Sequence, residues 1–313
     1  MDTLTNPIQV WPLSTEMKSV AHRIRFEGRV SFYDPRWHNS WLETDGVGTY
    51  VKLSPSPPLL RSGQRVRIEG TMVPLKGLAD DTVKVTVLQD YEPIEPLATK
   101  GRIRDFNALG GRIVTLDGYV DGQQLMDDDH LRLALVVEDR PIIGWVKPDD
   151  PRSIPDWQGK FVRLVGLYSA RYDPTATDTS IELWVGRQKD VGVLGALATE
   201  ASFDQPRRRI GEIPQAPLGE SVRIRGRVQT QQPGSFIVIR DETGQVEVQS
   251  LQEQRFPFDT EVDAVGRVAL VGSRWILQSA MYRKTNAPAP ANRASAESAA
   301  AIKTVGQVRE LSP

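Results

Sequence analysis

Alternating apolar and polar residues dominate the chain and predict β-strands. The stretch 23–33 shows the pattern most clearly, because its charged residues fall on one face while the other face carries the apolar residues Ile24, Phe26, Val30 and Phe32. A period of two is typical of an antiparallel strand that buries one face. The segments "SWLET" and "TYVKL", on either side of the turn "DGVG", predict a hairpin after this first strand.

The first strand occurs three times, each time with a glycine at its centre. The copies are "IRFEGRVSF" (24–32), "VTLDGYVDG" (114–122) and "VRIRGRVQT" (222–230), with the glycines Gly28, Gly118 and Gly226. A second glycine-centred strand follows each copy, and its glycines are Gly70, Gly166 and Gly266. Internal self-similarity of this kind marks tandem units, so the sequence predicts three copies of one β-module.

Each module is predicted to hold five strands: a long bent first strand, a hairpin, a connection and two closing strands. This order is that of a small OB-fold-like barrel, in which a mid-strand glycine lets the first strand bend sharply. A generic β-sandwich is the alternative. The predicted architecture is all-β, with three tandem five-stranded OB-fold-like barrels at residues 1–97, 98–205 and 206–285, and with an Ala/Pro linker and the start of a truncated fourth repeat at 286–313.

A short apolar segment precedes each predicted barrel, and we interpret it as a helical or turn-like preface that packs across a barrel end. The apolar positions of the three prefaces are Ile8, Val10 and Leu13, then Ile103, Phe106 and Leu109, then Ile210, Ile213 and Leu218. The last residues, "KTVGQVRELSP" (303–313), repeat the pattern with Val305, Val308 and Leu311. The chain is therefore expected to be a fragment of a longer array, and the fourth preface is expected to be loosely packed.

Composition and charge exclude several classes of function. The 313 residues include 39 Lys and Arg, 40 Asp and Glu, and no cysteine. Disulfides, thiol nucleophiles and Cys-ligated metal centres are therefore excluded. Nonspecific nucleic-acid binding draws on positive charge that neutralises phosphates, and this chain has no surplus of it. No apolar run approaches the roughly 20 residues of a membrane-spanning helix.

Three strings carry a resemblance to a known family: "RIRFEGRVSFYDPRWHNSWLETDGVGTYVKL", "LLRSGQRVRIEG" and "KTVGQVRELSP". They resemble the tandem OB-fold arrays in the extracytoplasmic sensor regions of large bacterial sensor histidine kinases. The resemblance covers all three modules and is weakest in the second, at "QQLMDDDHLRL" and "DDPRSIPDWQ". It implies an architecture and a place ahead of a membrane helix and a kinase, but no particular ligand. The chain itself contains no kinase motif.

Aromatic and cationic residues of the first two modules form the candidate ligand-binding face. In OB folds the loop after the first strand and the hairpin that follows form the usual binding surface. The residues expected on this outer face are Arg36, Trp37, Trp41, Tyr50, Lys52, Trp145 and Lys147. Such a face can stack bases or sugars. The alternative is that Trp37 and Trp41 cover the barrel mouth or the neighbouring module.

The other polar clusters predict surface structure rather than catalysis. We expect "DDDH" (127–130) to be a solvated hairpin tip, with a hard-cation site as the alternative. We expect residues 207–209, three arginines, to form a salt-bridging hinge, with phosphate contact as the alternative. No catalytic triad, P-loop, GxGxxG or HExxH motif is recognisable. The sequence therefore predicts no catalytic residue, metal site, cofactor or enzymatic activity.

The main functional prediction is a non-catalytic ligand-sensing or spacer region of a bacterial signal-transduction protein, with an unknown small ligand or partner protein. The alternatives are a single-stranded nucleic-acid-binding protein and a structural or assembly module that binds other proteins. The third module has Glu247 and Gln249 where the others have an aromatic residue and a lysine. For nucleic acid we thus expect a Kd no tighter than about 10⁻⁴–10⁻⁶ M.

No signal peptide is visible in the opening residues "MDTLTNPIQV". We expect a periplasmic or extracytoplasmic location if the chain is a sensor fragment, and a cytoplasmic one if it is complete. Membrane contact is expected only through segments outside this chain.

Overall fold

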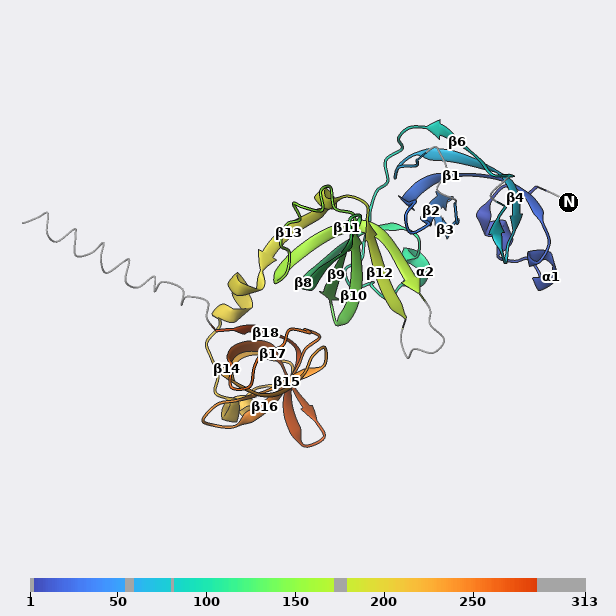
Figure 1. Ribbon diagram of the computed structural model, residues 1–313. Coiled ribbons are helices and arrows are strands. Elements are labelled where there is room, and N and C mark those ends of the chain that lie inside the picture. The colour runs from blue at the N-terminus through green and yellow to red at the C-terminus, as the bar shows by residue number, and fades with distance from the viewer. Residues whose placement is uncertain (1–2, 54–58, 80–81, 172–178, 286–313) are drawn as a thin grey trace, which may run out of the picture. The chain divides into compact units, whose positions relative to one another are not determined.

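The computed structural model of the protein describes residues 3–53, 59–79, 82–171 and 179–285 (Figure 1). Residue contacts divide the chain into two compact units. The first comprises Met1–Glu200, Pro233–Ser235 and Leu251–Gln254, and the second comprises Ala201–Gln232, Phe236–Ser250 and the chain from Arg255 onward. The predicted linker 286–301 and fourth preface 303–313 lie outside the described residues. No helix within the described ranges is long and apolar enough to cross a membrane.

The first module carries six strands in the first unit. They are β1 (His22–Asp34), β2 (Asn39–Thr44), β3 (Val47–Tyr50), β4 (Arg65–Val73), β5 (Gly77–Leu78) and β6 (Lys84–Gln89). Their order is β3-β2-β1-β4, with β5 and β6 both pairing with β4. The five predicted strands correspond to β1, β2, β3, β4 and β6, and β5 is an additional short strand. Within the described residues, β3 and β6 do not pair, so the sheet is not closed on that side.

The second module is a closed barrel, also in the first unit. Its strands are β7 (Leu97–Ala98), β8 (Ile113–Asp127), β9 (His130–Val137), β10 (Arg140–Val146), β11 (Lys160–Arg171), β12 (Ser180–Val185) and β13 (Val191–Ala196). The five barrel strands follow the order β8-β9-β10-β12-β11, and β11 closes the barrel on β8. The third and fifth barrel strands, β10 and β12, run parallel. The short strands β7 and β13 extend the sheet.

The third module is a closed barrel in the second unit. Its strands are β14 (Ser221–Gln232), β15 (Phe236–Arg240), β16 (Gln245–Gln249), β17 (Glu261–Val271) and β18 (Arg274–Lys284), in the order β14-β15-β16-β18-β17. Here too the third and fifth strands are parallel. Both closed barrels therefore have the five-stranded OB-type arrangement, and the predicted all-β class is confirmed.

Short helices connect and precede the modules. They are η1 (Pro7–Val10), α1 (Thr15–Lys18), α2 (Phe106–Leu109), η3 (Gln188–Asp190), η4 (Leu197–Thr199), η5 (Ala201–Asp204) and η6 (Ile210–Gln215). Three of them, η1, α2 and η6, coincide with the predicted prefaces. Ile103 and Ile210 are buried as expected, whereas Ile8 is only half-buried. Leu218, the last apolar position of the third preface, is 64% exposed, whereas Ala216 is buried.

A β-bulge follows the central glycine in the first strand of every module. The register shifts between Val30 and Phe32, between Val120 and Gly122, and between Val228 and Thr230. The glycines also lie close to neighbouring backbone: a Cβ on Gly226 would stand 2.5 Å from the Arg240 carbonyl oxygen. The close approach and the bend explain why glycine recurs here.

The bulge overturns the prediction that Phe32 shares a face with Ile24 and Val30. Ile24 and Val30 belong to the core of the first module. Past the bulge the alternation changes phase, and Phe32 packs instead with Ile113, Leu167 and Trp184 of the second module. A one-residue slip moves a side chain to the opposite face of a sheet, which is the physical reason for the error.

Candidate ligand-binding site

The candidate site lies at the interface between the first and second modules, which both belong to the first unit. Asp34, at the end of β1, shapes the loop that reaches this module interface. Its Oδ1 accepts hydrogen bonds from the backbone N–H groups of Arg36, at 2.9 Å, and Trp37, at 3.2 Å. An Asp side chain that accepts from the backbone two residues on is a common turn-forming device. The turn directs Trp37 toward the second module.

His130 of β9 is buried between two carboxylates at the module interface. Its Nε2 contacts Asp34 Oδ2 of the first module, and its Nδ1 lies 2.7 Å from Asp127 Oδ1. Both ring nitrogens are thus engaged by carboxylate oxygens, which fixes the orientation of the imidazole. Burial opposes ionisation of Asp127, but hydrogen bonds from the Asp129 backbone and from His130 prevail and lower its pKa.

Trp37 packs against aromatic residues of the second module. Its ring stacks on His130 with centroids 3.7 Å apart, and it meets the edges of Trp145 at 4.8 Å and Trp184 at 5.7 Å. The indole Nε1 donates to Asp127 Oδ2 at 3.2 Å. Arg36 contributes an outer ion pair to Asp129 at 2.9 Å. A loop of one module is thus held in the aromatic surface of the next.

A second contact at the module interface joins the β2–β3 hairpin to the segment before β8. The hairpin turns at Asp45 and Gly46, which both have positive φ, 52° and 77°, as a two-residue type I′ turn requires. The Gly46 carbonyl accepts a hydrogen bond from Arg112. A Cβ on Gly48 would stand 2.0 Å from the Gly111 carbonyl oxygen. Only glycine fits this approach of two backbones.

A hollow of about 400 Å³ opens beside these contacts, and we call it the interface hollow. Its walls come from both modules, and its lining residues are Trp37, His38, Asn39, Trp41, Tyr50, Ser169, Ala170, Arg171, Glu182 and Trp184. The volume lies within the usual range for small-molecule sites, which combine apolar walls with a few polar groups.

Trp41 and Tyr50 form the first module's wall of the interface hollow. They are cross-strand partners on β2 and β3, with ring centroids 5.8 Å apart. Hydrogen bonds fix both rings: Trp41 Nε1 donates to Asn39 Oδ1 at 2.8 Å, and the Tyr50 hydroxyl donates to the His38 carbonyl at 3.0 Å. Partial burial raises the pKa of Tyr50, so its hydroxyl stays protonated and keeps donating. Tyr50 is still 48% exposed and accessible to a ligand.

Glu182 and Trp184 form the opposite wall. Both lie on β12, where Ile181, Leu183 and Val185 face the core and the alternate residues face outward. Glu182 is only 9% exposed. No hydrogen bond reaches its carboxylate from the described residues, and its charged neighbour Arg171 stands 3.8 Å away. The "IELW" alternation in the sequence could have placed Glu182 on this face, but sequence reasoning missed it.

The structure brings some of the predicted face together and leaves other parts aside. Trp37, Trp41 and Tyr50 line the interface hollow. Trp145 is packed against Trp37, and its Nε1 is buried without a hydrogen-bond partner among the described residues. Arg36 is ion-paired, and Lys52 and Lys147 are exposed outside the lining. A ligand role for these seven residues stays a prediction.

The "DDDH" stretch is the predicted hairpin tip, since Asp127 and His130 are the last pair of the β8–β9 hairpin. It is not solvated throughout, because His130 is 3% exposed and both residues bind the first module. The local sequence could not predict the burial of His130, because its partner Asp34 is 96 positions away. The described residues contain no group of ligands that could hold a metal ion. Of the three arginines, Arg208 pairs with Glu220 of the same unit at 3.3 Å.

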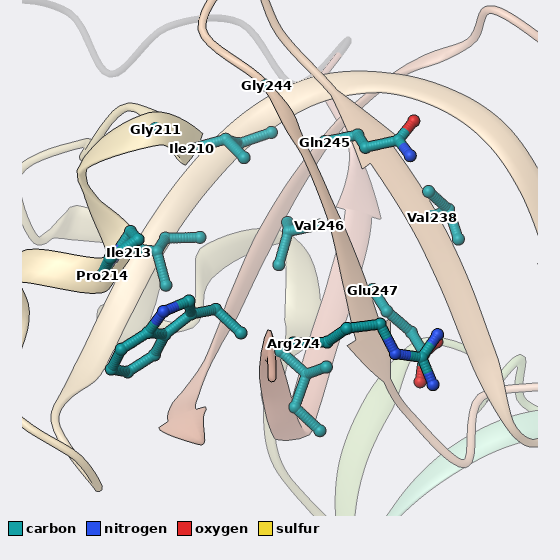
Figure 2. Close-up of a pocket in the computed structure, with 12 residues that line it drawn as sticks. Ile210, Gly211, Ile213, Pro214, Val238, Gly244, Gln245, Val246, Glu247 and Arg274 are labelled. Carbon is teal, nitrogen blue, oxygen red and sulfur yellow. The ribbon is translucent and has the colours of Figure 1, made fainter. Parts of the chain in front are cut away.

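A second hollow, of about 430 Å³, lies on the third module and is shown in Figure 2. Ile210, Ile213 and Pro214 of η6 line one side, and β16 lines the other. Its charged residues Glu247 and Arg274 stand 3.9 Å apart and compensate each other. Trp275 is the one aromatic residue in the lining of this hollow, whereas Trp37, Trp41, Tyr50 and Trp184 line the interface hollow. The interface hollow, beside the outer face of β2 and β3, is therefore the stronger candidate site.

Comparison with known proteins assigns the chain to no family. No protein-family model matches the chain. No curated protein matches it by sequence either. Among solved structures it is similar to the Stn1–Ten1 complex of S. pombe, at 18% identity over 31% of this chain and 90% of that chain, with a TM-score of 0.23.

Two further structures are similar at the same level. One is a murine DNA-binding protein bound with double-stranded DNA (13% identity, 57% of this chain, 98% of that chain, TM-score 0.24). The other is the OB domain of Ta0387 from Thermoplasma acidophilum (17% identity, 28% of this chain, 92% of that chain, TM-score 0.21). The OB-type assignment rests on the strand order described above, and these similarities carry no argument about function.

Proposed function

We propose that this chain is a non-catalytic binding protein whose first unit takes single-stranded nucleic acid, with a base held in the interface hollow. The observation that carries the proposal is the pair of Trp41 and Tyr50, fixed on the outer face of β2 and β3 and open to a hollow of about 400 Å³. In OB folds this face is the usual site for oligonucleotides and oligosaccharides. Stacking of a base on an aromatic ring contributes about 1–3 kcal/mol.

The charge of the site sets the expected strength and mode of binding. Arg171 lines the hollow, and Lys52 and Lys147 are exposed two residues along the chain from Tyr50 and Trp145. Across the chain, however, 39 basic residues stand against 40 acidic ones. Few phosphates can be neutralised, so stacking supplies most of the free energy. We expect a Kd of about 10⁻⁴–10⁻⁶ M and a shallow dependence on salt.

A second candidate function is the sensing or spacer region of an extracytoplasmic bacterial sensor kinase. The repeat pattern resembles such regions, and the packed module interface suits a rigid spacer. In a sensor, the interface hollow would hold a small ligand rather than a base of a single-stranded nucleic acid. The coding sequence downstream of residue 313 distinguishes the two: a further barrel, a membrane helix and a kinase support the sensor.

Tryptophan fluorescence titration tests the nucleic-acid proposal. Trp37, Trp41 and Trp184 line the hollow, so a bound base should quench the emission. A mixed-sequence single-stranded 12-mer should bind at low and physiological salt, with log Kd changing little between them. A duplex of the same sequence, whose bases cannot stack on the protein, should bind more weakly. No quenching by any single strand at millimolar concentration would contradict the proposal.

A further inference from the structure

We infer that the interface hollow selects guanine, and that Glu182 is the residue that reads it. This inference rests on the proposed binding of single strands and adds the base preference. It starts from Glu182, which lines the hollow, receives no hydrogen bond from the described residues and has Arg171 as its ion-pair partner at 3.8 Å. The residue is 9% exposed, so little of it other than the part that faces the hollow is open to solvent. A ligand in the hollow that donates hydrogen bonds to this carboxylate would take the place of water there.

The surroundings of Glu182 indicate a flat ligand. The carboxylate lines the same hollow as Trp184, two residues along β12, and as Trp41 and Tyr50 of the first module. Its side chain keeps 12% of its surface exposed, so its oxygens are not sealed from the hollow. A ring stacked on these aromatic walls would present its edge, rather than its face, to the carboxylate.

Guanine is the base whose edge matches this arrangement. An ionised carboxylate is an acceptor only and can take two parallel N–H bonds. Guanine presents two adjacent donors, N1–H and N2–H₂, beside the acceptor O6. Adenine, cytosine and thymine each present a single donor beside acceptors, which the carboxylate would repel. Arg171, 3.8 Å from Glu182, places a cationic donor next to the carboxylate, where it suits O6.

The test compares three oligonucleotides on the full chain. They are single-stranded 6-mers of thymine that carry one central guanine, inosine or adenine. Inosine has the shape of guanine but lacks the N2 amino group, so it removes one of the two donors. Wild-type protein should bind the guanine oligonucleotide about tenfold more tightly than the inosine one, the discrimination expected for one bidentate contact.

Two variants assign the preference to Glu182. In Glu182→Gln the amide offers one acceptor and one donor, so the guanine-to-inosine ratio should fall to within about twofold of unity. Glu95→Gln makes the same charge change at an exposed residue outside the hollow, and it should keep the wild-type ratio. Near-ultraviolet circular dichroism checks that both variants are folded.

The outcomes separate the inference from the proposed function. Equal binding of guanine and inosine by wild-type protein overturns the inference but leaves single-strand binding standing. A Glu182→Gln variant that keeps the preference, or that tightens all three oligonucleotides equally, also overturns it, because Glu182 would then only repel phosphates. If none of the oligonucleotides binds, the proposed function fails as well. The comparison of guanine with inosine uses the wild-type protein, so it tests the guanine preference even if the Glu182→Gln variant does not fold.

Discussion

Trp37 of the first module stacks on His130 of the second, with ring centroids 3.7 Å apart and an interplanar angle of 19°. The same imidazole contacts Asp34 of the first module and Asp127 of its own. Stacking and charge thus converge on one buried side chain. The contact fixes the wall of the interface hollow, because Trp37 lines that hollow as well.

Replacing His130 by alanine is expected to destabilise the first unit by about 3–5 kcal/mol. The change removes the stack with Trp37 and leaves the Asp34 and Asp127 carboxylates at a buried interface without their shared partner, and removing one partner of a buried polar pair costs about this much. Urea unfolding followed by fluorescence measures the loss. His38→Asn is the control, since His38 is exposed and has a φ of 50°, which asparagine tolerates. A loss below about 1 kcal/mol for the alanine variant would show that His130 does not hold the interface.

Trp37→Phe should cost more than Trp145→Phe, although both remove the same atoms. Trp37 loses its hydrogen bond to the Asp127 carboxylate, whereas the Nε1 of Trp145 is buried without a partner among the described residues. A hydrogen bond to a charged group contributes about 1.5–3 kcal/mol. Chemical denaturation of the two variants should therefore differ by about that amount. Equal losses would mean that the indole N–H of Trp37 contributes nothing.

The pH dependence of the third module should follow Asp263. Burial opposes ionisation of this 2% exposed carboxylate, but hydrogen bonds from Arg225 and Arg223 prevail and lower its pKa from the ordinary 3.8. A lowered pKa in the folded state means that the unfolded chain takes up the proton more readily. The contribution to stability is therefore complete above about pH 4 and is lost as the pH falls through the lower, folded value.

The Asp263→Asn variant tests whether Asp263 causes this pH dependence. The variant should be about 3–5 kcal/mol less stable than wild type at pH 7, because two arginines lose a buried partner. The difference should shrink steadily below about pH 4. Thermal unfolding at several pH values measures it, and a difference that stays constant down to pH 2 would exclude Asp263 as the titrating group.

The preface anchors provide a matched pair of substitutions. Ile103→Ala should cost about 2–5 kcal/mol, because the side chain is 3% exposed within the core of the second module. Leu218→Ala should stay within about 0.5 kcal/mol, because Leu218 is 64% exposed. Thermal or urea unfolding compares the two. A similar loss for both would mean that Leu218 is an anchor after all.

Local periodicity predicted the strands, their order and the glycine-centred bends, because a half-buried strand shows its face in the sequence. It placed Val30 on the core face and Tyr50 on the outer face, and both lie there. It failed at Phe32, where a bulge that no local pattern reveals reverses the faces. The bulge recurs at the same place in all three modules. An alignment of the three repeats on their glycines can therefore transfer the bulge from one module to the others, but only after the structure of one module has revealed it.

Only part of the candidate site could be predicted from the sequence. The aromatic residues of the first module stood out because exposed Trp and Tyr are uncommon on a strand. His130 and Glu182 did not stand out, because the residues they face are distant in the sequence: His130 contacts Asp34, and Glu182 faces the aromatic wall of the first module. Contacts between modules produce no periodic pattern of apolar and polar residues from which they could be predicted.

The most direct test of the account measures oligonucleotide affinity for two tryptophan variants. Trp41→Ala removes one wall of the interface hollow, and Trp275→Ala removes the aromatic residue of the third-module hollow in Figure 2. Since one stacked base contributes about 1–3 kcal/mol, the first variant should bind a guanine-containing single strand about tenfold more weakly. The second should match wild type within about twofold. Unchanged affinity for Trp41→Ala, or a larger loss for Trp275→Ala, would contradict the assignment of the ligand to the interface between the first two modules.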